Sequence, residues 1–221
     1  MKNFLLGVGM FFASNIAVGL ECYTYKIFEG KSALQEDLQS FINPRFIEMM
    51  HAYPYLYKMD LDEAQEIYDL WAARKHGVII VAYDQGVPVG YIRGMSLDSI
   101  LPAMVQTCKD AGVHVQTCYY ISDVFVDSAY RHQGLCTKLF KKIEEYAESL
   151  GYISGCLDSE THKNHPLQPA DYKEFDYSKF GYVLAQGAVC VLSKEIHAFN
   201  GIIDLEHTHT IDFWFKKLQN N

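Results

Sequence analysis

Positive charge is in short supply in this chain. Lysine and arginine number 19 against 27 aspartates and glutamates, which leaves a formal net charge of −8 over 221 residues. Affinity for nucleic acid comes mainly from neutralised phosphates, so an acidic protein gains little from such a partner. The composition therefore argues against nucleic-acid binding and suits a neutral or cationic small substrate better.

Long apolar runs and paired cysteines are also missing. No uninterrupted apolar span reaches the roughly 18 residues that a membrane helix needs, so no stable membrane insertion is expected. The six cysteines include no CxxC pair, so we expect no zinc site and assign no metal ligand. Scattered single cysteines in a chain of this size are typical of reduced, buried thiols.

The first 19 residues leave two interpretations open. A single lysine, an apolar run and small residues at 17–19 resemble a secretory signal. Ser14 and Asn15 dilute the apolar run, which favours an element packed into the domain instead. We expect a cytoplasmic protein, with export through this signal-like segment as the alternative.

What the chain does contain is ordinary globular composition. Its residues are 49% apolar, and 16 tyrosines and 13 phenylalanines supply large rings for burial. This length supports one good core, so residues 1–221 are expected to form a single domain. Residues 197–221 are expected to form a C-terminal extension of it.

Hydrophobic periodicity predicts helices and strands that are mixed along the chain. Residues 78–95 form the clearest hairpin, with a glycine turn and Pro88 marking an edge or a bulge. Asp60 and Glu63 predict a capping box that opens a helix to about residue 75. Further strands are expected at 21–30, 114–127 and 152–157, and a second hairpin at 182–196. Helices are expected at 32–51, with an interruption at Pro44, and at 97–111, 135–149 and 171–181. A polar loop is expected at 159–170 and an amphipathic stretch at 211–218. This mixture predicts an α+β fold, with a mostly antiparallel central sheet flanked by helices.

The segment RHQGLC, residues 131–136, connects a predicted strand to the start of an amphipathic helix. The first backbone N–H groups of a helix lack partners and carry partial positive charge, so such a place binds phosphate oxygens. Gly134 allows close approach or a positive φ, Arg131 adds a permanent charge, and Thr137 adds a hydroxyl donor. The alternative is a plain strand-to-helix turn with a surface arginine.

This strand, loop and helix resemble the coenzyme A-binding motif of the GNAT N-acetyltransferase superfamily. The family pattern is Arg/Gln-x-x-Gly-x-Gly/Ala, which Arg131 and Gly134 match, while Cys136 replaces the second small residue. Residues 177–182, YSKFGY, resemble the family's Tyr-x-x-x-Gly-Phe/Tyr segment. The resemblance spans about residues 21–196, and the family's asparagine before the last helix has no clean counterpart.

The resemblance implies a GNAT-like acyl-CoA N-acyltransferase fold that uses acetyl-CoA as cosubstrate. The acetyl group would move to a primary amine of a small molecule or protein by direct attack. Backbone groups at Val124 and Val126, with Phe125 between them, would bind the pantetheine and the carbonyl. The residues implied to hold the pyrophosphate are Arg131, His132, Gln133, Gly134, Leu135, Cys136 and Thr137.

The resemblance also implies a general acid and a general base. Tyr177 is the candidate acid, because a phenol with a pKa near 10 can protonate a thiolate. Asp123 and Glu160 are the candidate bases, with Asp158, His162 and a water chain as alternatives. Each of these side chains also has a structural interpretation, as a packing tyrosine, a solvated carboxylate or a loop histidine.

Two rival functions remain at this point. One is a coenzyme A-binding module without turnover, used for sensing or interaction, and the other is an exported protein that shares only the fold. The acceptor groove is expected between the helices of 32–75, the 97–111 insertion and the 159–170 loop. A homodimer is left open.

Overall fold

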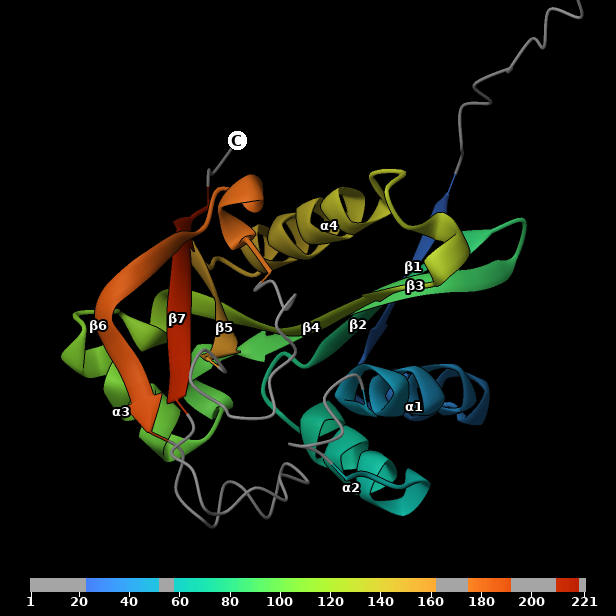
Figure 1. Cartoon of the computed structure of the whole chain (residues 1–221), viewed down its shortest axis with the longest axis horizontal. Coiled ribbons are helices and arrows are strands. Elements are labelled where there is room, and N and C mark those ends of the chain that lie inside the picture. The colour runs from blue at the N-terminus through green and yellow to red at the C-terminus, as the bar shows by residue number, and fades with distance from the viewer. Residues whose placement is uncertain (1–22, 52–57, 162–174, 192–209, 219–221) are drawn as a thin grey trace, which may run out of the picture.

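A single mixed sheet forms the centre of the molecule. The computed structural model describes residues 23–51, 58–161, 175–191 and 210–218. Seven strands lie in the order β1-β2-β3-β4-β5-β7-β6 (Figure 1). The strands are β1 (Thr24–Glu29), β2 (Val78–Asp84), β3 (Val87–Ser96), β4 (Cys118–Val126), β5 (Ser154–Thr161), β6 (Val183–Val191) and β7 (Thr210–Lys217). All neighbours are antiparallel except β4 and β5, which confirms the predicted α+β class.

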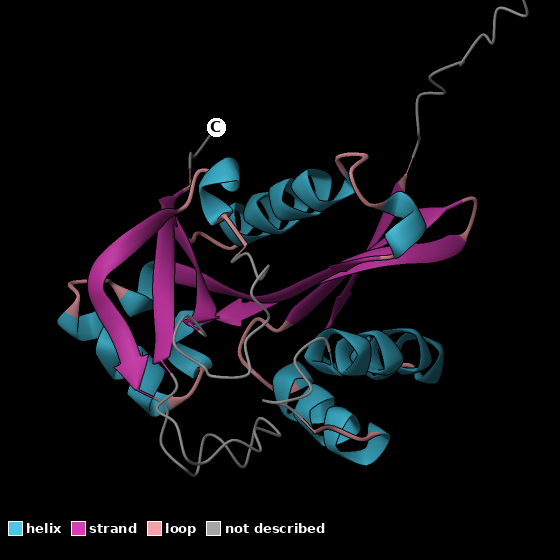
Figure 2. Ribbon diagram, viewed as in Figure 1, coloured by secondary structure: helices cyan, strands magenta, loops and turns pink. Residues whose placement is uncertain are grey.

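Helices cover both faces of this sheet, as Figure 2 shows. Helix α4 lies on one face, and α1 and α2 lie on the other (Figure 1). The described helices are α1 (Glu36–His51), α2 (Leu61–Ala72), α3 (Pro102–Asp110) and α4 (Leu135–Ser149). The short 3-10 turns are η1 (Gly30–Leu34), η2 (Leu97–Ser99), η3 (Val115–Thr117), η4 (Ser128–Tyr130) and η5 (Tyr177–Phe180). Two large buried clusters result, one beneath α4 and one beneath α1, α2 and α3, and a small third cluster lies between α1 and α2.

Local sequence signals place several elements correctly. Asp60 Oδ1 accepts the Glu63 N–H at 2.9 Å, and Glu63 Oε2 accepts the Asp60 N–H at 3.0 Å, so the predicted capping box opens α2. The register between β2 and β3 shifts opposite Pro88, which confirms the bulge expected there. Helix α2 ends at Ala72, slightly before the predicted end.

Pro44 does not interrupt its helix, so that prediction was wrong. Helix α1 continues through Pro44, and Phe41, Ile42 and Phe46 on either side of it are buried. A proline removes one helical hydrogen bond and crowds the preceding turn. We infer that burial of the flanking apolar side chains offsets this local cost.

The hairpin predicted for 182–196 is also absent within the described residues. Residues 183–191 form one strand, β6, whose partner is β7 near the end of the chain. The register shifts between Leu184 and Val189, so the glycine-containing stretch lies in an irregular part of the strand. A partner from a distant segment was available, and periodicity within the segment does not reveal it.

Strand β5 is longer than predicted. It runs to Thr161 because it pairs along its whole length with β7, so Asp158 and Glu160 lie within the strand and not beyond it. The signal-like segment 1–19, the aromatic stretch 53–57, most of the predicted loop 159–170 and His162 lie outside the described residues.

Candidate functional site

The sheet opens between β4 and β5. The two strands pair in parallel only from Cys118 with Ser154 to Ile121 with Leu157. Beyond that point β4 continues to Val126 and β5 continues to Thr161 beside β7. The edge of β4 that faces β5 therefore has backbone groups without a strand partner over 122–126.

A bulge in β4 begins this opening. Arg93 of β3 pairs with Asp123, whereas the next residue, Gly94, pairs with Ile121, so Ser122 is an extra residue in β4. A bulge reverses the alternation of side chains along a strand. As a result Val124 and Val126 pack on the α4 side, whereas Phe125 packs in the opposite core.

Gly94 makes the bulge tight. A Cβ at this position would lie 2.5 Å from the Tyr119 ring, 2.7 Å from the Tyr120 carbonyl oxygen and 2.9 Å from Ile143 Cδ1. Real Cβ atoms essentially never come this close to a non-bonded heavy atom, so only glycine fits between β4 and α4 here. The close approach fixes the place at which β4 bends away from β5.

A loop of unpaired amides lies at the end of β4. Gly134 has φ 78° and precedes α4, and His132 also has a positive φ of 62°. The first α4 residue with a backbone acceptor is Lys138, whose N–H donates to the Gly134 carbonyl at 3.1 Å. Among the described residues, the N–H groups of 132–137 donate no close backbone hydrogen bond. This arrangement suits an anion such as a pyrophosphate.

Four side chains shape this loop through hydrogen bonds and packing. Arg131 Nε donates to the Val126 carbonyl at 2.9 Å, which ties the exposed guanidinium to the end of β4. Leu135 is buried and anchors the helix, while Gln133 Nε2 donates to the Ala129 carbonyl at 2.8 Å. Burial raises the pKa of the Cys136 thiol to about 11, so this residue acts as a small neutral packing group. Cysteine therefore fits the position where the family motif has glycine or alanine.

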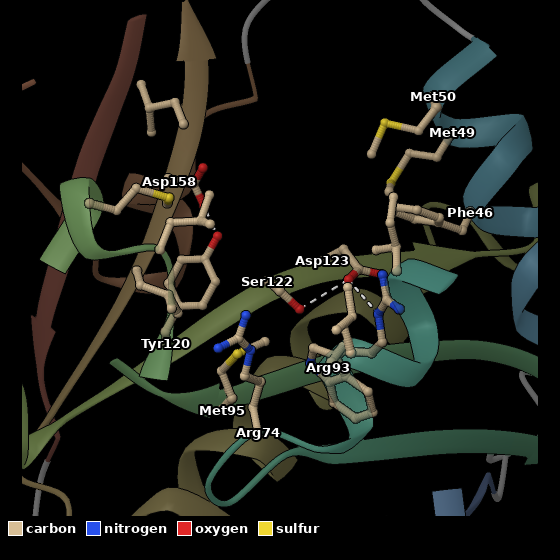
Figure 3. Close-up of a pocket in the computed structure, with 17 residues that line it drawn as sticks. Phe46, Met49, Met50, Arg74, Arg93, Met95, Tyr120, Ser122, Asp123 and Asp158 are labelled. Atoms are coloured by element: carbon tan, nitrogen blue, oxygen red, sulfur yellow. Dashed lines mark hydrogen bonds and ion pairs between the residues drawn. The ribbon is translucent and has the colours of Figure 1, made fainter. Parts of the chain in front are cut away.

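A cavity of about 290 Å³ lies on the other face of the sheet. Side chains from α1, α2, α3, β3, β4 and β5 surround it, as Figure 3 shows in part. It occupies the region between the 32–75 helices and the 97–111 insertion where the acceptor groove was expected. Its polar groups come mostly from β3, β4 and β5, next to the opening in the sheet.

Asp123 enters this cavity as half of a buried ion pair. Arg93 Nε donates to Asp123 Oδ1 at 2.6 Å, and the two side chains are only 4% and 7% exposed. Ser122 Oγ donates to the same oxygen at 3.0 Å, while Asp123 Oδ2 is buried without a hydrogen-bond partner among the described residues. The Arg93 guanidinium therefore holds this carboxylate in place through one of its two oxygens.

Asp158 is the second carboxylate of the cavity. Tyr120 Oη donates a hydrogen bond to Asp158 Oδ1, and Figure 3 shows the phenol pointing at the carboxylate. Burial raises the pKa of the Asp158 carboxyl from 3.8 to about 6, although the Tyr120 hydrogen bond opposes the rise. A carboxyl with this pKa is largely ionised at neutral pH and accepts a proton more readily than an ordinary aspartate.

Tyr177 lies on the opposite face of the sheet. It begins η5, which ends at Gly181 with φ 82°, and its ring packs edge-on against Trp214 with centroids 5.7 Å apart. Trp214 Nε1 donates to Ser159 Oγ at 3.0 Å, so Tyr177 stands beside β5 on the α4 side. Phe180 of the same turn stacks on Phe140 of α4, which holds η5 against the helix.

The structure separates the predicted site residues into two groups. The loop 131–137 and Tyr177 lie on the α4 side, and Asp123 lies in the cavity on the other side. For Glu160 only the backbone is described, opposite Ile211 of β7. The Tyr120 and Asp158 pair was not predicted from the sequence, because only folding brings these two residues together.

Comparison with known proteins gives the class. The Acetyltransferase (GNAT) family profile matches residues 44–170. The chain belongs to this family of acetyltransferases. None of the curated proteins compared with it matches.

Solved structures agree on the fold. An N-acetyltransferase from Staphylococcus aureus Mu50 superposes with a TM-score of 0.54 at 14% identity, over 90% of this chain and 99% of that one. An aminoglycoside 6′-N-acetyltransferase complexed with coenzyme A has the same TM-score and identity, over 90% and 98%. A structure from Salmonella typhimurium with acetyl-CoA has a TM-score of 0.52 at 12% identity, over 90% and 96%. At these identities the likeness extends to the fold.

No helix among the described residues has the length and apolarity to cross a membrane. No three histidine, cysteine, aspartate or glutamate side chains in the described ranges gather in a way that would hold a metal ion.

Proposed function

We propose that this protein transfers an acetyl group from acetyl-CoA to a primary amine by direct attack. The observation that carries the proposal is the opening between β4 and β5. An amide-lined loop lies on one face of the sheet beside it, and a cavity with a buried carboxylate lies on the other. The two substrates can approach from opposite faces and meet in the opening. The family membership and the coenzyme A complexes of similar folds support the same reaction.

The α4 side is assigned to the cofactor. The free N–H groups of 132–137 and the charge of Arg131 bind the pyrophosphate, as Gly134 with its positive φ allows. The unpaired edge of β4 at Val124–Val126 offers backbone groups to the pantetheine and the thioester carbonyl. Acetyl-CoA supplies the activated acyl group, and the protein positions it.

Proton transfer is assigned to Asp158 and Tyr177. Asp158 removes a proton from the acceptor ammonium, and the free amine nitrogen then attacks the carbonyl carbon. The new C–N bond forms as the C–S bond breaks, and Tyr177 gives its phenolic proton to the leaving thiolate. We prefer Asp158 to Asp123 and Glu160 as the base, because Asp123 is held by Arg93 and Asp158 has a raised pKa.

A binding measurement tests the cofactor loop. Arg131→Glu places a negative charge beside the pyrophosphate, so the dissociation constant for acetyl-CoA should rise by roughly tenfold or more. Lys141→Glu makes the same charge change on the exposed face of α4, where Lys141 is 76% exposed, and should leave the affinity within about twofold. Equal affinities in calorimetry for the wild type and Arg131→Glu would remove the loop assignment.

A turnover measurement separates an enzyme from a binding module. Release of the coenzyme A thiol is followed with a panel of primary amines, and the acetylated product is identified by mass spectrometry. Tight acetyl-CoA binding without release of coenzyme A for any amine would favour a module without turnover. Absence of acetyl-CoA binding would contradict the proposed function altogether.

A further inference from the structure

We infer that the acceptor is a free α-amino acid with a large apolar side chain, whose carboxylate binds Arg74. This inference rests on the proposed function, because it assigns the cavity on the α1 and α2 side to the acceptor. It goes further in naming the groups that distinguish one amine from another.

The lining is mostly apolar and rich in methionine. Unbranched thioether side chains fill irregular space and adapt to the shape of an apolar ligand. Aromatic and aliphatic side chains complete the surface. The apolar residues that line the cavity are Phe46, Met49, Met50, Ile67, Leu70, Trp71, Met95, Ile100, Leu101, Met104 and Ile211. A polar or polycationic acceptor would leave this surface without a matching group.

Arg74 adds a positive charge at the wall of this apolar space. It follows the end of α2, where its backbone N–H donates to the Trp71 carbonyl at 2.9 Å, and its side chain is exposed. Figure 3 shows its guanidinium directed between Tyr120 and Ser122, into the cavity. No carboxylate in the described parts of the chain pairs with it. A planar guanidinium in such a place suits a ligand carboxylate.

The other charges of the cavity complement an amino group. Arg93 is paired with Asp123 and buried, so it has little capacity for a ligand. Asp158 and the unpaired Asp123 Oδ2 are acceptors for an ammonium group. The cavity thus offers negative charge near the opening in the sheet and positive charge at Arg74. A zwitterion with both groups on one carbon matches this pattern.

Size and charge disfavour other amines. A volume of about 290 Å³ lies at the lower end of the range for small-molecule sites, which suits a compact acceptor. Arg74 would repel a polyamine or an aminoglycoside, and a simple alkylamine would leave the guanidinium unused. A large apolar amino acid, such as leucine, methionine or phenylalanine, uses every part of the cavity.

The test compares three forms of the same side chain. L-Phenylalanine, L-phenylalaninamide and phenethylamine share the ring and the amine, but only the first has a carboxylate. We expect kcat/KM for the amino acid to exceed the values for the amide and the amine by at least tenfold. L-Leucine and L-methionine with their amides and decarboxylated amines repeat the comparison for aliphatic side chains.

Two variants at neighbouring cations show which positive charge causes the preference for the amino acid over the amine. Arg74→Gln should raise KM for the preferred amino acid by at least tenfold and change KM for the matching amine by less than twofold. Lys75→Ala removes the next cation, which pairs with Asp98 and lines no part of the cavity, and should change neither value. A merely structural effect of Arg74 would raise both KM values together.

The outcomes distinguish this inference from the proposed function. If the amines are acetylated as well as the amino acids, the amino-acid assignment is overturned while the transferase function stands. The same holds if the amino acids are preferred but Arg74→Gln leaves that preference unchanged. If no compound is acetylated, calorimetry of L-phenylalanine and phenethylamine with the coenzyme A-bound protein provides the readout. The inference is supported if L-phenylalanine binds more strongly than phenethylamine and Arg74→Gln abolishes this difference. Equal binding of the two compounds to the wild type refutes it.

Discussion

Replacing Asp158 by asparagine should stabilise the protein and inactivate it at the same time. Asparagine can still accept the hydrogen bond from Tyr120, and it carries no charge in the cavity. The folded-state pKa of Asp158 is raised from 3.8 to about 6 by burial. Folding therefore favours the protonated carboxyl. Its contribution to the free energy of unfolding is fully present below about pH 4 and is lost as the pH rises through about 6.

The magnitude follows from this rise in pKa. At 1.36 kcal/mol per pKa unit, ionisation of Asp158 costs at most about 3 kcal/mol of folding free energy above pH 7. Because the side chain keeps some surface toward the cavity, we expect Asp158→Asn to gain about 1–3 kcal/mol at pH 8 and almost nothing at pH 4. The loss of the base should lower kcat/KM by about 10²–10⁴.

Urea unfolding at several pH values, followed by tryptophan fluorescence, measures the gain. Asp110→Asn makes the same chemical change at an exposed carboxylate of α3 and should alter stability by less than about 0.5 kcal/mol at every pH. A gain that does not depend on pH would refute the argument from burial. A stable variant with unchanged kcat/KM would refute the role of Asp158 as base.

Three further substitutions test the parts around this carboxyl. Tyr120→Phe removes the hydrogen bond that lowers the Asp158 pKa, so the rise of kcat/KM with pH should move to higher pH. A pH profile equal to that of the wild type would contradict the pairing of these two residues. Tyr177→Phe keeps the ring packing on Trp214 but removes the acid, so kcat should fall at least about tenfold while the acetyl-CoA dissociation constant stays within twofold. Gly94→Ala places a Cβ 2.5 Å from the Tyr119 ring and should lower the free energy of unfolding by about 3 kcal/mol or more, measured in urea. A decrease of less than about 1 kcal/mol would show that β4 can shift.

The sequence alone determined the parts of this protein whose causes are local. The glycine turn of the β2–β3 hairpin, the capping box at Asp60 and the amphipathic pattern of α4 each depend on residues a few positions apart. The loop from Arg131 to Thr137 is local in the same sense, because an unpaired helix start and a glycine with positive φ require only their own neighbours. The resemblance of this loop to a known family therefore predicted the fold, and the assignment of the loop to the cofactor remains a prediction.

Only the tertiary structure decided how the surroundings of the two cavity carboxyls differ. Asp123 and Asp158 are both aspartates on strands, but Arg93 pairs with the first and Tyr120 with the second, over separations of 30 and 38 residues. The bulge at Ser122 and the insertion of β7 between β5 and β6 set which side chains face the cavity. A pKa depends on burial and on the charges that folding brings close, so it follows from these distant contacts and not from the residue type.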